Sequence, residues 1–166
     1  MRGVDGLERL NGLPEEAAVA ELLAVCHSGR WAERVAAGRP YPDLEALQAA
    51  ADEVWMALDP ADWLEAFKAH PRIGESGGRS ADWSRQEQAG VGGTGAEVRE
   101  RLAAGNAEYE RRFGHVFLIS AAGRDAAEIL DALQARLGND PGTELRVAAG
   151  EHRRITRLRL EKLVAA

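Results

Sequence analysis

Helix-start and helix-stop signals punctuate this 166-residue chain from end to end. Pro14 followed by Glu15 and Glu16 has the form of a helix start, and Asp43 and Asp59-Pro60 begin two further segments in the same way. Between the signals, alanine, leucine, glutamate and arginine dominate, whereas β-branched residues are sparse. This pattern predicts an all-α fold.

The segments add up to about seven or eight helices, which we expect to form a single compact domain over residues 1–166. The expected helices begin near Glu15, Ser28, Asp43, Pro60, residue 81 and Thr94, and two more cover about 124–137 and 141–164. The apolar run 115–119 is compatible with a buried strand, but five residues do not decide between strand and helix.

Charge and composition exclude several classes of protein. The chain has 21 Lys+Arg against 27 Asp+Glu, and its net charge of -6 argues against a general nucleic-acid or anionic-membrane binder. It has no apolar run of about 18 residues and no apolar N-terminal core like that of a signal peptide, so we expect a cytoplasmic protein.

We expect neither a metal nor a cofactor. The single cysteine excludes a multi-cysteine zinc site, and the four histidines show no ligand spacing. Residues 90–95 match the G-x-G-x-x-G string of dinucleotide sites, but the segment before them is polar and helix-prone rather than a strand.

Arg159 is the first residue whose position in the sequence indicates a possible functional role. It lies four residues after Ile155 and four before Leu163, inside the apolar arc of the last helix. A guanidinium directed at a core is costly unless it is paired or opens into a cleft. The spacing therefore leaves two readings, a buried ion pair or a ligand-binding cation.

His70 continues the apolar face of Trp63 and Phe67, and Pro71 should end the helix there. An imidazole at a helix C-terminus can hold and deliver a proton near neutral pH. The alternative is a hydrogen-bonded histidine that closes the helix. A third group, Ser84, Glu87 and Gln88, projects from one side of a short expected helix. Three readings fit this pattern: a polar binding face, a capping box, or a face that is simply exposed to solvent.

These residues belong to an ordered series of motifs: His70-Pro71-Arg72-Ile73-Gly74, Ser84-x-x-Glu87-Gln88-Ala89-Gly90, Asn106-x-x-Tyr109-x-x-x-Phe113-Gly114, Arg136-Leu137-Gly138-Asn139 and Leu158-Arg159-Leu160. Over essentially its whole length, the chain resembles the decarboxylases of 2-oxo-4-hydroxy-4-carboxy-5-ureidoimidazoline (OHCU). These enzymes belong to the ureide pathway of urate breakdown.

The resemblance implies an all-helical, cofactor-free homodimer that converts OHCU to (S)-allantoin, with His70 as general acid/base, Glu87 orienting and Arg159 anchoring the substrate. It also implies the residues that bind the substrate: Pro71, Ser84, Arg85, Gln86, Glu87, Gln88, Phe117, Leu118, Ile119, Ser120 and Ala121. Ser120 stands where many relatives carry cysteine, which should matter little if this segment binds through its main chain. The C-terminus lacks the peroxisomal Ser-Lys-Leu ending, which also favours the cytoplasm.

Two other functions remain open at this level. A helical binding module would recognise a protein partner through Trp31, Trp55, Trp63 and Trp83, with no turnover of OHCU. An enzyme of the same fold would act on another ureido or imidazoline acid.

Overall fold

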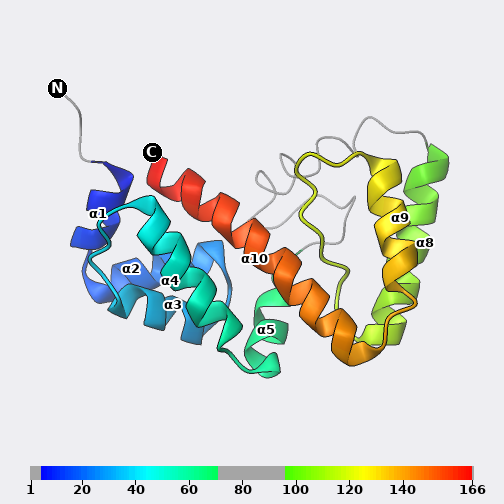
Figure 1. Cartoon of the computed structure of the whole chain (residues 1–166), viewed down its shortest axis with the longest axis horizontal. Coiled ribbons are helices and arrows are strands. Elements are labelled where there is room, and N and C mark those ends of the chain that lie inside the picture. Colours follow the sequence, from blue (N-terminus) through cyan, green and yellow to red (C-terminus); the bar gives the residue numbers. More distant parts are fainter. Residues whose placement is uncertain (1–4, 71–95, 166) are drawn as a thin grey trace. The chain divides into compact units, whose positions relative to one another are not determined.

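A computed structural model describes residues 5–70 and 96–165 of the chain, and these residues form eight helices and no strand. The all-α prediction is confirmed for this part of the chain. In order, the helices are α1 (Gly6–Gly12), α2 (Glu15–Val25), α3 (Gly29–Ala37), α4 (Leu44–Met56), α5 (Pro60–Phe67), α8 (Ala96–Phe113), α9 (Ala126–Arg136) and α10 (Pro141–Ala165) (Figure 1).

The helices divide between two compact units. Unit 1 comprises residues up to 66 and from 153 onward, and unit 2 comprises residues 67–152. Helix α10 contributes to both units, because its residues through His152 belong to unit 2 and those from Arg153 to unit 1. One domain over residues 1–166 stays a prediction.

Local capping explains where several helices begin. Ser28, Asp43 and Asp125 each accept a hydrogen bond from a backbone N–H in the first turn of the helix that follows. Helix α1 escaped the sequence analysis, because its short segment carries few apolar residues. Its Leu7 and Leu10 are nevertheless buried, so packing supplies what helix propensity does not.

Helix α5 ends at Phe67, and His70 follows it in a turn in which the His70 N–H donates to the Phe67 carbonyl at 3.1 Å. The prediction that the helix stops before Pro71 is confirmed. His70 itself is not helical, because the residue before a proline avoids helical geometry.

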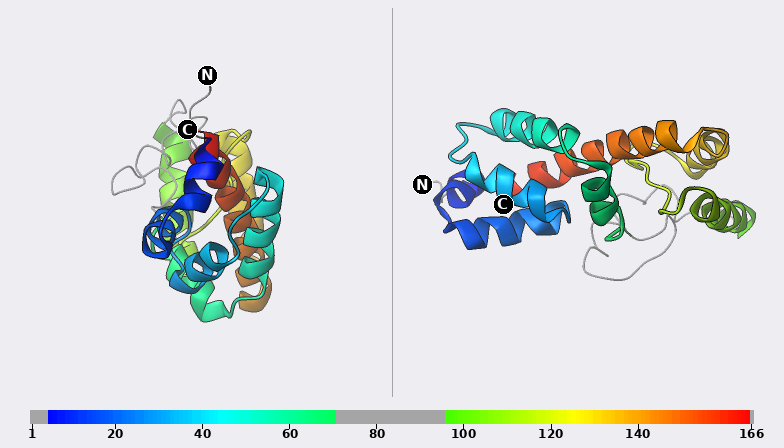
Figure 2. Two further views of the ribbon diagram at one scale, coloured as in Figure 1. Left: turned by 90° about the vertical axis from the view of Figure 1, so that its left-hand side faces the viewer. Right: turned by 90° about the horizontal axis from the view of Figure 1, so that it is seen from below.

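The core of unit 1 contains three tryptophans, which come from α3, α4 and α5. The indole N–H of Trp31 donates to the Ala51 carbonyl at 3.1 Å, and that of Trp63 donates to the Trp55 carbonyl at 2.8 Å. Helix α3 lies beside both α2 and α4 (Figures 1 and 2). Since Trp31, Trp55 and Trp63 are buried, they form no surface for a protein partner, and Trp83 lies outside the described residues.

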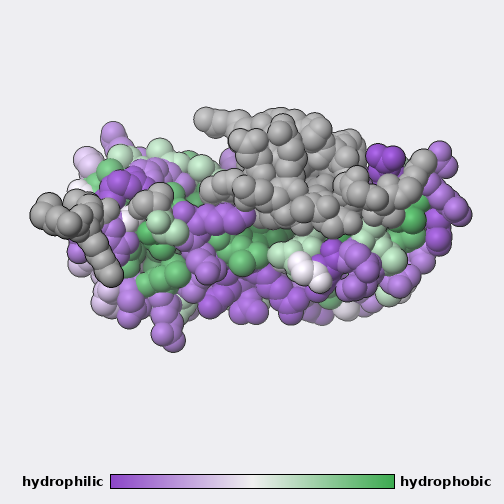
Figure 3. Space-filling view, turned by 90° about the horizontal axis from the view of Figure 1, so that it is seen from above, coloured by the Kyte–Doolittle hydropathy of each residue, from purple (hydrophilic) through white to green (hydrophobic). Residues whose placement is uncertain are grey.

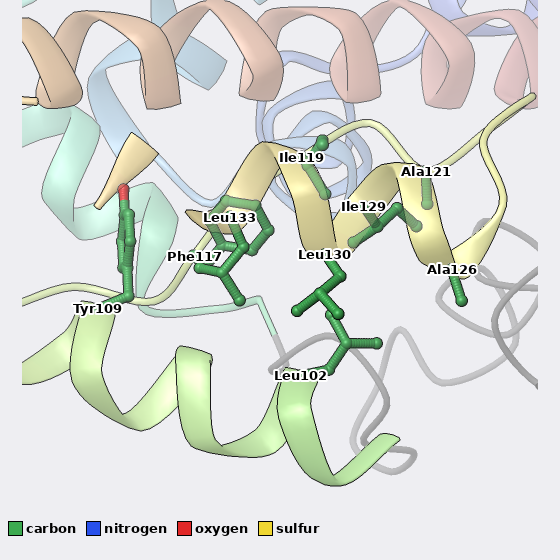
Figure 4. Close-up of a cluster of buried hydrophobic side chains, with 9 residues drawn as sticks. All are labelled: Leu102, Tyr109, Phe117, Ile119, Ala121, Ala126, Ile129, Leu130 and Leu133. Atoms are coloured by element: carbon green, nitrogen blue, oxygen red, sulfur yellow. The ribbon is translucent and has the colours of Figure 1, made fainter. Parts of the chain in front are cut away.

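The core of unit 2 lies between α8, α9 and the segment that joins them. Leu102 of α8 points toward Leu130 of α9, and Phe117 and Ile119 of the joining segment pack against the same cluster (Figure 4). Gly114 ends α8 with φ of 80°, a conformation that glycine adopts without strain. The run 115–119 is neither strand nor helix, and Phe117 to Ala121 are buried.

Polar side chains make up much of the described surface visible in Figure 3. Among the large hydrophobic residues that the structure describes, Met56 alone is exposed. None of the described helices is long and apolar enough to cross a membrane.

Candidate active site

His70 lies three residues beyond the C-terminal end of α5, with its imidazole half-buried. Its ring meets the ring of His152 edge-on, with 4.7 Å between the ring centroids and 80° between the planes. His152 belongs to α10 and is fully buried, and its ring also lies near that of Phe67, at 5.7 Å between the ring centroids. A histidine held in this way can exchange a proton on one side while its ring is fixed on the other.

The predicted substrate-binding segment, residues 117–121, is held from two directions within unit 2. The Arg136 Nη1 donates to the Leu118 carbonyl at 2.7 Å, and the Ser120 N–H donates to Glu151 Oε1 at 3.0 Å. All five residues of the segment are buried. The main chain of this segment is therefore a fixed surface, as binding through backbone groups requires.

A buried polar network anchors Arg136 in turn. Its Nε and Nη2 donate to Glu144 Oε2 at 2.9 and 2.5 Å, and the Tyr109 hydroxyl donates to the same oxygen. The other carboxylate oxygen accepts from Asn139 Nδ2 at 3.0 Å. Burial and the hydrogen bond to Glu144 raise the pKa of Tyr109, so the phenol stays protonated and acts as a donor.

Arg159 is buried in unit 1, at 2% exposure, as its place in the apolar arc predicted. Its Nη1 donates to the Val25 carbonyl at 3.3 Å, and its charge acts on the neighbouring Cys26 thiol. Burial raises the pKa of that thiol to about 12, so Cys26 is a neutral core residue at physiological pH. The helix therefore presents Arg159 to the interior of unit 1.

The other arginines of the C-terminal helix lie on a polar face, which is the pattern of a solvated surface. Arg153 and Arg157 keep side-chain exposures of 42% and 41% and also pair with Asp52 of α4, at 3.8 and 2.5 Å. Arg157 also contacts Gln48. These two side chains therefore attach α10 to α4 within unit 1, and Arg154 is the exposed member of the group.

The predicted site residues fall into three places. His70 and residues 117–121 belong to unit 2, and Arg159 belongs to unit 1. The remaining ones, Pro71, Ser84, Arg85, Gln86, Glu87 and Gln88, lie outside the described residues. The convergence of His70, Glu87 and Arg159 on one cavity stays a prediction.

Sequence reasoning missed the two α10 residues that contact the predicted site within unit 2, Glu151 and His152. His152 is far from His70 in the chain, and no spacing rule connects the two. A signal for Glu151 is present in the sequence, because it is an acidic residue beside the apolar arc of the last helix. Across residues 5–70 and 96–165, no group of three or more metal-ligating side chains is arranged to hold a metal ion.

Comparison with known proteins identifies relatives of this chain. The family described as OHCU decarboxylase matches residues 11–161. The uric acid degradation bifunctional protein TTL of Arabidopsis thaliana is 38% identical over 86% of this chain, and the corresponding protein PucL of Bacillus subtilis is 32% identical over 95%. The chain spans 46% and 32% of the lengths of these two relatives.

Another relative is similar over nearly its full length. The 2-oxo-4-hydroxy-4-carboxy-5-ureidoimidazoline decarboxylase of Amia calva is 33% identical over 99% of this chain and 94% of its own. Among solved structures, OHCU decarboxylase in the presence of (S)-allantoin is 35% identical with a TM-score of 0.79, over 88% of this chain and 98% of that one. The structure of an (S)-allantoin synthase shares the fold. It is 20% identical, with a TM-score of 0.73, over 95% of this chain and 53% of that one. By its match over residues 11–161, this chain belongs to the OHCU decarboxylase family.

Proposed function

We propose that this chain decarboxylates OHCU to (S)-allantoin in urate breakdown, without a cofactor. The observation that carries the proposal is the family match over residues 11–161, which includes His70, the fixed segment 117–121 and Arg159. The half-buried His70 beside a buried aromatic ring supports it, because a general acid/base needs both access to substrate and a defined orientation.

The substrate supplies the chemistry that other decarboxylases take from a cofactor. When the bond to the carboxylate breaks, CO2 leaves and the electron pair of the bond passes into the adjacent ring C=N bond, whose nitrogen takes up a proton. A proton then adds to the carbon that bears the ureido group, and the 4-hydroxyl loses its proton to become the ring carbonyl. The protein has to orient the substrate, exclude water and deliver the proton to one face.

We assign these tasks to three side chains and one segment. His70 accepts and delivers the protons, and Arg159 binds an anionic or carbonyl edge through its paired donors. Glu87 and Gln88 hydrogen-bond the ureido and ring nitrogens, and Glu87 also orients His70. The backbone of residues 117–121, together with Pro71, Ser84, Arg85 and Gln86, completes the binding site.

The test follows optical activity after fresh OHCU is mixed with the protein. The wild type is expected to give (S)-allantoin well above the spontaneous rate. His70→Ala should lower kcat by about 10²- to 10⁴-fold, the usual contribution of one placed acid/base. His27→Ala, which changes a half-buried histidine of unit 1, is the matched control and should keep wild-type kcat.

Racemic product at the spontaneous rate with the wild type would refute the proposed function. Turnover of a panel of other ureido and imidazoline acids then tests the second candidate function, which is an enzyme of this fold with a different substrate. Arg159→Lys keeps the charge but loses the planar fork, so we expect KM to rise while the protein stays folded. An unchanged KM would remove Arg159 from the site.

We also propose that the enzyme acts as a cytoplasmic homodimer, on the strength of the resemblance to its family. Light scattering on the purified chain gives the mass in solution, and a mass of one 17.9 kDa chain would refute the dimer. Fractionation of cells that express the chain tests the location.

A further inference from the structure

Two neighbouring residues of α10 contact the parts of the proposed site in unit 2 that the structure describes, namely residues 117–121 and His70. Glu151 accepts a hydrogen bond from the Ser120 N–H at 3.0 Å, and the ring of His152 lies edge-on against the ring of His70. Adjacent residues of a helix point about 100° apart, so one turn of α10 reaches two different elements.

Glu151 fixes the C-terminal end of the segment. Its Oε1 accepts from the Ser120 N–H and also from Arg124 Nη1 at 3.3 Å, and the Arg124 N–H closes a turn onto the Ala121 carbonyl at 3.1 Å. The carboxylate is almost completely buried. A hydrogen bond from an N–H to an ionised carboxylate is about twice as strong as a neutral one, so this contact sets the position of the segment's main chain.

His152 fixes the orientation of the His70 ring. Its own ring is fully buried and packs against Phe67 on α5 as well as against His70, so it has little freedom to move. Edge-to-face contacts between rings are directional. The contact therefore selects one ring plane for His70, three residues beyond Phe67.

We propose that Glu151 and His152 are positioning residues, and that they set the place of the His70 imidazole relative to the substrate-binding backbone of residues 117–121. This inference rests on the proposed decarboxylase function. A misplacement of about 1 Å between a catalytic group and its substrate costs on the order of 100-fold in rate. A single rigid helix that holds both parts removes that misplacement.

Two variants test Glu151. Glu151→Leu removes the acceptor at similar volume, and we expect KM for OHCU to rise by about tenfold because the 117–121 backbone loses its anchor. Glu151→Gln keeps an acceptor oxygen and should restore KM to within about threefold of the wild type. A Gln variant as impaired as the Leu variant would refute the acceptor role.

Two variants also test His152. His152→Ala removes the ring, and kcat should fall by about tenfold or more while KM changes little, since the His70 proton transfer is affected rather than binding. His152→Phe keeps a ring edge against His70 and should retain kcat within about threefold. If the Ala variant does not fold, His152→Leu fills the volume without a ring, and the same fall in kcat is expected.

Matched controls separate positioning from general loss of structure. Glu161→Gln changes an exposed acid of the same helix, and His115→Phe changes another histidine that packs on Phe67, at 5.3 Å. Both should keep wild-type KM and kcat per folded molecule. If the wild type is active and Glu151→Leu and His152→Ala match it in KM and kcat, the positioning role is wrong, although the proposed function stands. If the wild type itself shows no turnover, the proposed function fails first.

Discussion

Each of the two units buries an arginine, and the two are held in different ways. In unit 2, Arg136 uses Nε and Nη2 on the Glu144 carboxylate and Nη1 on the Leu118 carbonyl, and its guanidinium lies 4.5 Å above the Phe117 ring. In unit 1, Arg159 is more deeply buried and donates to the Val25 carbonyl at 3.3 Å. Burial alone therefore does not tell the role of an arginine, whereas its partners do.

The largest effect should come from separating the buried pair of unit 2. Arg136→Leu leaves the Glu144 carboxylate buried without its cation, and we expect the free energy of unfolding to fall by about 3–5 kcal/mol. Chemical denaturation measures the change.

The double variant, Arg136→Leu with Glu144→Leu, removes both charges and should lose less stability than the single one. If the single variant costs under about 1 kcal/mol, the pair does not hold unit 2 together, and the contrast with Arg159 disappears.

Close packing at two glycines gives the next comparison. A Cβ on Gly6 in unit 1 would overlap the backbone of Val164, 2.7 Å from its carbonyl carbon, whereas a Cβ on Gly105 in unit 2 would meet the end of the Leu133 side chain at 2.5 Å. Backbone cannot move aside as a flexible side chain can. Gly6→Ala should therefore cost about 1–3 kcal/mol in thermal unfolding, and Gly105→Ala less. The reverse order would contradict the packing described here.

The buried thiol of unit 1 predicts a pH dependence. Burial raises the pKa of Cys26 from 9.0 to about 12, so the folded state disfavours the thiolate. The contribution to stability is complete below pH 9 and is lost as the pH rises toward 12, with a slope of at most about 1.4 kcal/mol per pH unit. Cys26→Ala should show a shallower loss between these limits in denaturation measured at several pH values. Equal slopes would contradict the assignment.

The smallest effect belongs to an exposed ion pair of unit 1. Arg9 forms two hydrogen bonds with Glu21, at 2.6 and 2.8 Å, which lower the pKa of that carboxyl, but both side chains are partly exposed to solvent. Arg9→Ala should change the free energy of unfolding by less than about 1 kcal/mol, and high salt should remove most of the difference. A loss of unfolding free energy as large as that of Arg136→Leu would show that solvent exposure does not explain the difference between the two ion pairs.

The sequence predicted the elements whose signals are local. Ser28, Asp43 and the proline starts mark the true beginnings of helices, and the 3.6-residue period places Arg159 in the interior. Such features depend only on residues a few positions apart. Helix α1 was missed although Asp5 caps its first turn, because seven residues are too few to show a helical period.

The contacts that hold the proposed site could not be predicted in the same way. His152 meets His70 across 82 positions of the chain, and Glu151 reaches Ser120 across 31. Periodicity describes which face a residue occupies, but not which element packs against that face. The family resemblance supplied the site residues themselves, whereas Glu151, His152 and the role of Arg136 emerged from the fold.

The positions of the tryptophans make the two units distinguishable by fluorescence. Trp31, Trp55 and Trp63 all belong to the interior of unit 1, and the fourth tryptophan of the chain is Trp83. In a Trp83→Phe protein, every remaining indole would report on unit 1, while far-ultraviolet circular dichroism would report on all helices. Comparing the two melting curves would show whether the units lose their structure in one cooperative step or in two.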